Sequence, residues 1–254
     1  FVVLLLLKVP IGFILGIIAT IGLYIGGYSL RLLPSRYFAG IDSFVLLAIP
    51  FFLLTGEIMK ESGITHKIIN FSESVVGNLK GGLGHVNVLA SIIFAGISGV
   101  AVADTAAIGS ILIPGMTDVG YPKPYATAIT AASSIIGPII PPSMSMVVYG
   151  ATVNMSIAGL FAAGMLPGLL MGLSMMVMNH IICTTKGYEV KEKAQTNYFE
   201  NLRKTFLDGF LALLLPIILI GGILGGVFSP TEAAAVSAVY AFVVAVFIYR
   251  DIGL

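Results

Sequence analysis

The sequence contains no tryptophan, one cysteine, three histidines and few charged residues. The single cysteine, Cys183, excludes an internal disulfide, and the histidines do not have the spacing of a metal site. Charged residues make up only 10% of the chain and the net charge is +1, so nothing indicates nucleic-acid binding. A soluble domain is also excluded, because 57% of the residues are hydrophobic.

Long apolar runs are what the sequence has instead. Runs of about 20 residues recur along the chain, which is the length that a helix needs to cross a bilayer. Strands of a membrane barrel would show alternating segments of roughly 10 residues. The sequence therefore predicts an all-α integral membrane protein. Because Phe1 lies inside an apolar run and Leu254 follows a helix exit, we expect a fragment of a longer protein.

One passage, SSIIGPIIPPSMSMVVYG at 133–150, interrupts such a run. Its prolines, Pro138, Pro141 and Pro142, lack a backbone N–H and clash with the preceding helical turn. A helix that enters this passage must stop near Gly137 and restart after Pro142. Carbonyls left unpaired at bilayer depth cost several kcal/mol each, unless they face protein or a cavity that holds water, ions or ligand. We interpret the break as a binding site; a proline kink used only for packing is the alternative.

A second interruption joins the apolar pieces 83–97 and 100–116 at Ser98-Gly99. A single helix over both pieces is too long for one crossing, so we predict a re-entrant hairpin with its tip at Ser98-Gly99. The tip leaves carbonyls of the first arm and N–H groups of the second arm without helical partners. Asp104 follows one turn later, where a carboxylate at a helix centre costs roughly 2.5 to 3.5 kcal/mol. Two roles are open for it: a contact in the site, or a bond to neighbouring backbone.

The basic residues favour the hairpin. If it enters and leaves the membrane on one side, the loops 60–82, 117–124 and 183–205 share a side. All Lys and Arg other than Arg31 and Arg36 then lie on that side. Such a bias is typical of a cytoplasmic face. A single crossing would divide the basic residues between both faces, so we expect these three loops to be cytoplasmic.

Four passages resemble one family. They are GIDSFVLLAIPFFLLTGEIM, FAGISGVAVADTAAIGSILIPGM, IIGPIIPPSMSMVVYGA and FSPTEAAAVSAVYA. Together they are similar to the large membrane subunit, DctM-type, of the tripartite ATP-independent periplasmic (TRAP) transporters, in the family's order and over the whole chain. The resemblance implies an elevator-type secondary transporter with two inverted repeats, each with a re-entrant hairpin and a discontinuous helix. The first repeat is complete here, and the second has only its opening helices.

The resemblance also implies a function and partners. Such proteins take up an organic acid, for example a C4-dicarboxylate or sialic acid, across the bacterial inner membrane with Na⁺ as the coupling ion. A soluble periplasmic substrate-binding protein delivers the substrate, and a small membrane subunit of the DctQ type packs against the scaffold within the lipid bilayer.

The resemblance implies a first Na⁺ site that is made by backbone carbonyls of the hairpin tip and the break. These carbonyls fall on Ala95, Ser98, Gly137, Ile140 and Pro142. Candidate substrate contacts are Ser98, Gly99, Asp104 and Ser143. At the tip the family often has the sequence Ser-Gly-Ser, whereas this chain has Ser98-Gly99-Val100, with valine in place of the second serine. Ligation by the backbone survives that change, but any contact from the missing hydroxyl does not.

The resulting division of the chain is a prediction of its domains. We expect scaffold helices in 1–59, an amphipathic connector in 60–82, half of a transport domain in 83–155 (hairpin 83–116 and broken helix 124–153), a transmembrane helix in 156–182, a polar cytoplasmic loop in 183–205 and the first helices of the second repeat in 206–254. The connector is expected to lie on the membrane surface, with Thr65 as its N-cap. Glu57 is either an interface residue or a buried polar partner.

Three other functions compete with this interpretation. A stand-alone sodium/dicarboxylate-type carrier would need no binding protein. An intramembrane enzyme would use Ser98, Ser143 or Asp104 catalytically, but the sequence shows no partnered base and no paired aspartate motif, so we expect no enzyme activity. A purely structural subunit has no need of two interruptions at bilayer depth.

Overall fold

The computed structural model describes residues 1–188 and 198–249, and these ranges contain helices and turns with no strand. The chain divides into two compact units, residues 1–44 and 45–254, and each unit is described by itself. Within the described ranges, three helices are long and apolar enough to cross a membrane: Ile157–Lys186, Tyr198–Leu224 and Pro230–Tyr249. The prediction of an all-α membrane protein is thereby confirmed.

The first unit holds α1 (Val2–Leu6), α2 (Ile11–Ile25) and α3 (Leu32–Ile41). Ile14 is the one buried residue of α2, and apolar side chains such as Phe13 and Ile25 are exposed. A helix that is apolar all round needs an apolar environment on every side. The exposed surface of α2 is therefore suited to lipid or to another membrane helix.

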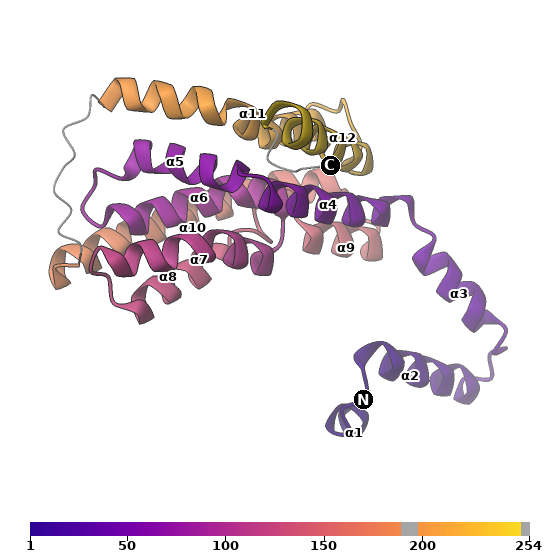
Figure 1. Cartoon of the computed structure of the whole chain (residues 1–254). Coiled ribbons are helices and arrows are strands. Elements are labelled where there is room, and N and C mark those ends of the chain that lie inside the picture. The colour runs from indigo at the N-terminus through magenta and orange to yellow at the C-terminus, as the bar shows by residue number, and fades with distance from the viewer. Residues whose placement is uncertain (189–197, 250–254) are drawn as a thin grey trace. The chain divides into compact units, whose positions relative to one another are not determined.

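The second unit contains the larger set of helices (Figure 1). They are α4 (Ala48–Glu61), α5 (Ile64–Val76), α6 (Gly82–Ser98), α7 (Ala101–Asp118), α8 (Lys123–Ser134), α9 (Met144–Val153), α10 (Ile157–Lys186), α11 (Tyr198–Leu224) and α12 (Pro230–Val243), which continues as a π-helix over Val244–Tyr249. A 3₁₀ turn, Phe44–Leu47, precedes α4. Ser229 caps α12 with a capping box, because its hydroxyl accepts from the Glu232 N–H while Glu232 accepts from the Ser229 N–H.

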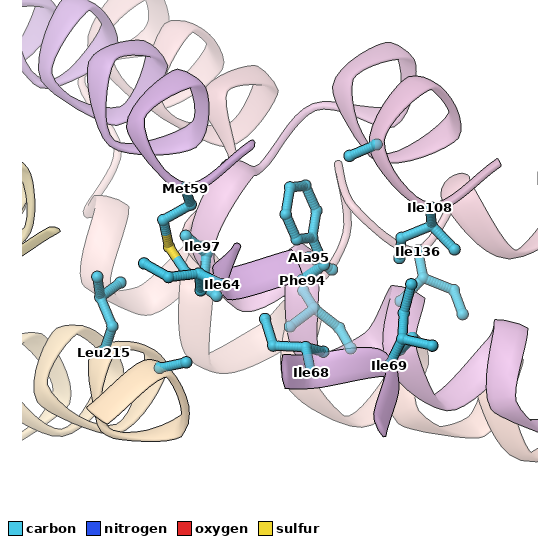
Figure 2. Close-up of a cluster of buried hydrophobic side chains, with 14 of the residues drawn as sticks. Met59, Ile64, Ile68, Ile69, Phe94, Ala95, Ile97, Ile108, Ile136 and Leu215 are labelled. Atoms are coloured by element: carbon cyan, nitrogen blue, oxygen red, sulfur yellow. The ribbon is translucent and has the colours of Figure 1, made fainter. Parts of the chain in front are cut away.

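The core of the second unit is organised around α6, which packs against α5, α7, α8 and α10. Almost every residue of α6 is buried. Figure 2 shows Phe94 and Ile97 of α6 among Met59 of α4 and Ile68 of α5. Small residues along α6 allow this close packing, as in other membrane helix bundles. The hairpin tip at the end of α6 is therefore held by a rigid core.

Several boundaries differ from the prediction. The expected loop 183–205 is shorter, because α10 continues to Lys186 and α11 begins at Tyr198. Residues 189–197 of that loop lie outside the described residues. Helix α5 buries Ile64, Ile68 and Ile69 against neighbouring helices, notably α6 and α11, and so its apolar side faces protein. The expectation that this side rests on the membrane surface was wrong.

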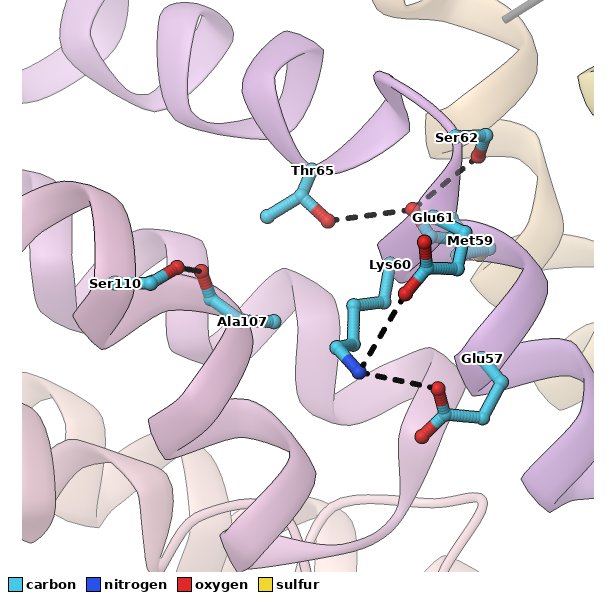
Figure 3. Close-up of polar contacts among 8 residues, drawn as sticks. All are labelled: Glu57, Met59, Lys60, Glu61, Ser62, Thr65, Ala107 and Ser110. Carbon is cyan, nitrogen blue, oxygen red and sulfur yellow. Dashed lines mark hydrogen bonds and ion pairs between the residues drawn. The ribbon is translucent and has the colours of Figure 1, made fainter. Parts of the chain in front are cut away.

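The N-cap of α5 was also predicted incorrectly. Gly63, not Thr65, occupies the N-cap position. Thr65 lies inside the helix, buried, and its hydroxyl donates to the Met59 carbonyl at 3.3 Å (Figure 3). This hydrogen bond links α5 to the end of α4. The two helices are separated by a turn of only two residues.

Candidate functional site

The hairpin tip is a two-residue turn between α6 and α7. Gly99 ends α6 in the left-handed conformation, with φ of 62°, and its N–H donates to the Ala95 carbonyl at 3.3 Å. Glycine is the usual residue for this helix ending because it has no Cβ to clash. Val100 is extended and provides no side-chain cap, so α7 begins at Ala101 with uncapped N–H groups. The turn lies one residue after the predicted tip at Ser98-Gly99, since Ser98 is the last residue of α6.

The break in the second interrupted helix also lies where the prolines predicted it. Helix α8 ends at Ser134 and α9 begins at Met144. The peptide bond between Pro141 and Pro142 is cis. Ser143 is the N-cap of α9: its hydroxyl accepts from the Met146 N–H at 3.2 Å and donates to the Pro138 carbonyl at 2.5 Å. The hydroxyl thus acts both as a donor and as an acceptor, and both hydrogen bonds stabilise the backbone conformation of the break.

The tip and the break are in direct contact. A Cβ added to Gly99 would collide with the Pro142 carbonyl oxygen and would lie 3.2 Å from the Cα of Ser143. On the other side of the contact, a Cβ on Gly137 would lie 3.5 Å from the Ala101 nitrogen. The absence of a side chain at Gly99 therefore lets the two backbone segments approach each other.

Several carbonyl oxygens of the tip and the break have no hydrogen-bond donor. Among the described residues, no hydrogen bond reaches the carbonyls of Ser98, Gly137, Ile140 or Pro142. The fifth predicted ligand, the Ala95 carbonyl, accepts only from Gly99 outside its own helix. Buried carbonyls are almost always paired, so a set of unpaired carbonyls needs an explanation. A bound cation satisfies several carbonyl oxygens at once.

The side chain of Ser98 is enclosed by protein. Ser98 is buried, and its hydroxyl accepts from the Val100 N–H at 3.5 Å. Helix α4 approaches it closely, since a Cβ on Gly56 would lie 3.5 Å from the Ser98 Cβ. The Ser98 hydroxyl is therefore not exposed to a ligand.

Asp104 lies in the first turn of α7 and is buried. Its side chain has no exposed area, and neither carboxylate oxygen has a hydrogen-bond partner among the described residues. The side chains that interact with it are Ser134 of α8 and Ser91 of α6. The alternative that Asp104 bonds to neighbouring backbone is therefore wrong. A substrate contact is not favoured either, because the carboxylate is enclosed by three helices.

A network of buried polar side chains surrounds these serines, and the sequence interpretation missed it. Asn87 donates to Thr130 at 2.6 Å and accepts from Ser133 at 3.0 Å, and Ser133 lies 3.0 Å from the Ser91 hydroxyl. A signal was present in the sequence: Asn87 and Ser91 are four residues apart, and so share one face of an apolar helix. Polar residues in that pattern indicate a polar seam between helices.

Glu57 occupies the exposed end of α4. Its side chain is 59% exposed and lies 3.2 Å from the Lys60 ammonium group, which also approaches Glu61 at 3.7 Å (Figure 3). Of the two roles considered for Glu57, the buried polar partner is therefore wrong. An exposed pair of this kind contributes about 0 to 1 kcal/mol to stability.

Comparison with known proteins assigns the chain to a family. The family model "Tripartite ATP-independent periplasmic transporter, DctM component" matches residues 1–254. The chain is 44% identical to the sialic acid TRAP transporter large permease protein SiaM of Vibrio cholerae, over 96% of this chain and 57% of that protein. It is 47% identical to the sialic acid TRAP transporter permease protein SiaT of Haemophilus influenzae, over 84% of this chain and 34% of that protein.

Relatives with other substrates in their names are almost as similar. The C4-dicarboxylate TRAP transporter large permease protein DctM of Pseudomonas aeruginosa is 42% identical, over 89% of this chain and 52% of that protein. The chain spans about half the length of the curated relatives it matches. These relatives are permeases and not enzymes, which speaks against an intramembrane enzyme. With the family model matching its full length, the chain belongs to the DctM family of TRAP transporter large permeases.

Proposed function

We propose that this chain supplies the first repeat of a Na⁺-coupled importer of organic acids, and that the contact between tip and break is its first Na⁺ site. The observation that supports the proposal is the group of unpaired carbonyl oxygens on Ser98, Gly137, Ile140 and Pro142. Na⁺ is a hard cation, for which oxygen ligands are suitable. The Ala95 carbonyl, at the end of α6, completes the proposed ligand set.

The substrate is an organic anion in this proposal. The uncapped N-terminus of α7 directs free N–H groups toward the tip, and helix N-termini favour anions. The relatives' names mention sialic acid, 2,3-diketo-L-gulonate and C4-dicarboxylates, all of which are carboxylates. Gly99 at the tip is the substrate contact that we retain from the sequence, whereas Ser143 is used as a cap and Ser98 is enclosed.

The proposal includes the partners and the location. A DctQ-type small membrane subunit and a periplasmic substrate-binding protein act with the complete large subunit in the bacterial inner membrane. The loops 60–82, 117–124 and 183–205 lie on the cytoplasmic side, as the positive charges indicate. The scaffold role of 1–59 and the elevator movement of 83–155 belong to the same proposal.

Uptake into proteoliposomes tests this function. The full-length large subunit is reconstituted with its small subunit, and labelled sialic acid, C4-dicarboxylates and sugar acids are offered with and without an inward Na⁺ gradient and the binding protein. We expect uptake of one class of organic acid that requires both the gradient and the binding protein. Uptake that requires the Na⁺ gradient but not the binding protein would identify a stand-alone carrier. Uptake that is the same with and without the Na⁺ gradient would refute the coupling to Na⁺.

A further inference from the structure

The apolar stripe of α5 continues beyond the part that neighbouring helices cover. Ile64 and Ile68 of this stripe are buried, and Phe71 and Val75 follow them at the same helical spacing. Phe71 is only partly buried, and Val75 is 37% exposed. Helix α11 packs along α5 (Figure 1). The end of α5 therefore presents apolar surface beside the beginning of α11.

A groove lies between these two helix ends. Its cavity volume is about 450 Å³. The groove is apolar apart from one arginine, and its lining residues are Phe71 and Val75 of α5 with Phe199, Leu202, Arg203 and Phe206 of α11. The rings of Phe71 and Phe206 have their centroids 6.1 Å apart. The two helices are joined here by a hydrogen bond of 2.8 Å between the hydroxyls of Thr205 and Ser74.

Arg203 supplies a positive charge to this groove. Its side chain has no ion-pair partner among the residues that the structure describes. A guanidinium group is always charged, and its planar set of N–H donors matches two oxygens of a phosphate at once. The groove therefore combines an apolar body with one uncompensated cation that is suited to a phosphate.

The position of Arg203 along α11 corresponds to the surface of a bilayer. The helix has 27 residues and is about 40 Å long, whereas the hydrocarbon core of a bilayer is about 30 Å thick. The charged residues of α11 all lie in its first half: Glu200, Arg203, Lys204 and Asp208. The beginning of α11 thus fits the headgroup level, and its apolar second half fits the hydrocarbon core. The groove lies where these two levels meet.

We propose that this groove binds an anionic phospholipid of the surrounding bilayer, with the phosphate on Arg203 and an acyl chain against Phe71, Val75 and Phe206. Basic pockets between membrane helices are suited to anionic headgroups. An apolar protein segment in the groove would instead bury the arginine without a counter-charge, which is strongly unfavourable. The lipid would link the connector 60–82 to α11. This inference goes beyond the proposed function and does not depend on Na⁺ coupling.

Native mass spectrometry tests the site. The full-length large subunit with its small subunit is delipidated in detergent and titrated with dioleoylphosphatidylglycerol, or in parallel with dioleoylphosphatidylcholine. We expect Arg203→Gln to lower the affinity for phosphatidylglycerol about fivefold, because one favourable charge contact is lost. The affinity for phosphatidylcholine, whose headgroup carries no net charge, should remain within about twofold of the wild-type value.

Lys204 provides the matched control for charge. It is the next residue of α11 and is exposed, but it does not line the groove. The substitution Lys204→Gln removes the same charge from the same part of the helix. Because an exposed charge outside the groove is screened by salt, we expect its affinity for phosphatidylglycerol to stay within about twofold of the wild-type value.

A second variant tests the apolar part of the groove. Val75→Trp fills the groove without a change of charge, and we expect it to weaken the binding of both lipids. Leu207→Trp is its control, since Leu207 is 60% exposed and lies outside the groove. Combining Arg203→Gln with Val75→Trp should weaken phosphatidylglycerol binding by less than the product of the single effects, because both act on one lipid.

Three outcomes would overturn the proposal. Equal losses of phosphatidylglycerol affinity in Arg203→Gln and Lys204→Gln would show a general effect of charge and no site. Wild-type affinity in both Arg203→Gln and Val75→Trp would show that protein covers the groove in the complete transporter. Displacement of the lipid by sn-glycerol 3-phosphate, which has the phosphate but no acyl chain, would assign Arg203 to a soluble anion. None of these results would affect the proposed Na⁺-coupled uptake.

Discussion

The contact between tip and break and the surroundings of Asp104 differ in the part of the chain that supplies their oxygens. At the contact between tip and break, the oxygens belong to the backbone, and the side chains there are absent, apolar or enclosed. Around Asp104, the oxygens belong to side chains on three regular helices. A backbone site depends on where the helices stop, whereas a side-chain site depends on which residues the helices carry. The two regions should therefore respond to different kinds of substitution.

The largest effect is expected where the helix interruption itself is removed. Replacing both Pro141 and Pro142 with alanine restores two backbone N–H groups and removes the ring clashes that prevent a helix. The helix is then free to continue toward α9, and the carbonyls at the break become paired. We expect sodium-stimulated uptake to be abolished, measured in proteoliposomes with the complete transporter.

Pro114 provides the control for this double variant. It lies inside α7, away from both interruptions, and so Pro114→Ala removes a helix-interior proline without closing a break. That variant should retain Na⁺-dependent uptake. Unchanged sodium stimulation in the double proline variant would remove the basis for the carbonyl site.

A smaller but still large effect is expected for Gly99→Ala. Alanine in the left-handed conformation costs roughly 1 to 2 kcal/mol. The added Cβ also collides with the Pro142 carbonyl oxygen, and so displaces the tip from the break. Because each 1.4 kcal/mol corresponds to about a tenfold change, we expect Na⁺ affinity to fall about tenfold or more. The half-saturating Na⁺ concentration for uptake measures this effect.

Gly120→Ala separates the two causes of that effect. Gly120 also has a positive φ, of 99°, but a Cβ there would meet no atom within 4 Å. This variant carries the backbone strain without the collision at the site. Similar losses of Na⁺ affinity in Gly99→Ala and Gly120→Ala would show that the contact between tip and break is not the cause.

The smallest effect is expected for Ser98→Ala. The proposed ligand is the Ser98 carbonyl, which the substitution retains, and the hydroxyl is enclosed by Gly56 and Val100. We expect the half-saturating Na⁺ concentration to stay within about twofold of the wild-type value, since the one hydrogen bond that is lost, from the Val100 N–H at 3.5 Å, is long and therefore weak. A large loss of Na⁺ affinity would mean that the Ser98 side chain, and not its backbone, binds the ion.

Both interruptions were predictable from the sequence because their causes are local. Prolines at Pro138, Pro141 and Pro142 cannot continue a helix, and Gly99 favours the left-handed end of α6. The all-α membrane class followed from the apolar runs. Local residue types therefore predicted where carbonyls would be left without helical partners.

The features that the sequence did not predict depend on tertiary contacts. The apolar side of α5 was expected on a membrane surface, but it packs on α6 and α11, and an amphipathic pattern alone is the same in both cases. The surroundings of Asp104 require Ser91 and Ser134 to meet from helices that lie far apart in sequence. The periodicity of a sequence shows which residues share one face of a helix, but it does not show which other helix packs against that face.

Binding of ²²Na⁺ to the wild-type transporter and to the variant with Pro141→Ala and Pro142→Ala tests the central claim most directly. The full-length protein with its small subunit is titrated with Na⁺ in detergent, with Pro114→Ala alongside. If the unpaired carbonyls at the break bind Na⁺, the double variant binds fewer ions per transporter than the wild type, and Pro114→Ala binds the same number. Equal stoichiometry and affinity in all three proteins would contradict a Na⁺ site at the contact between tip and break.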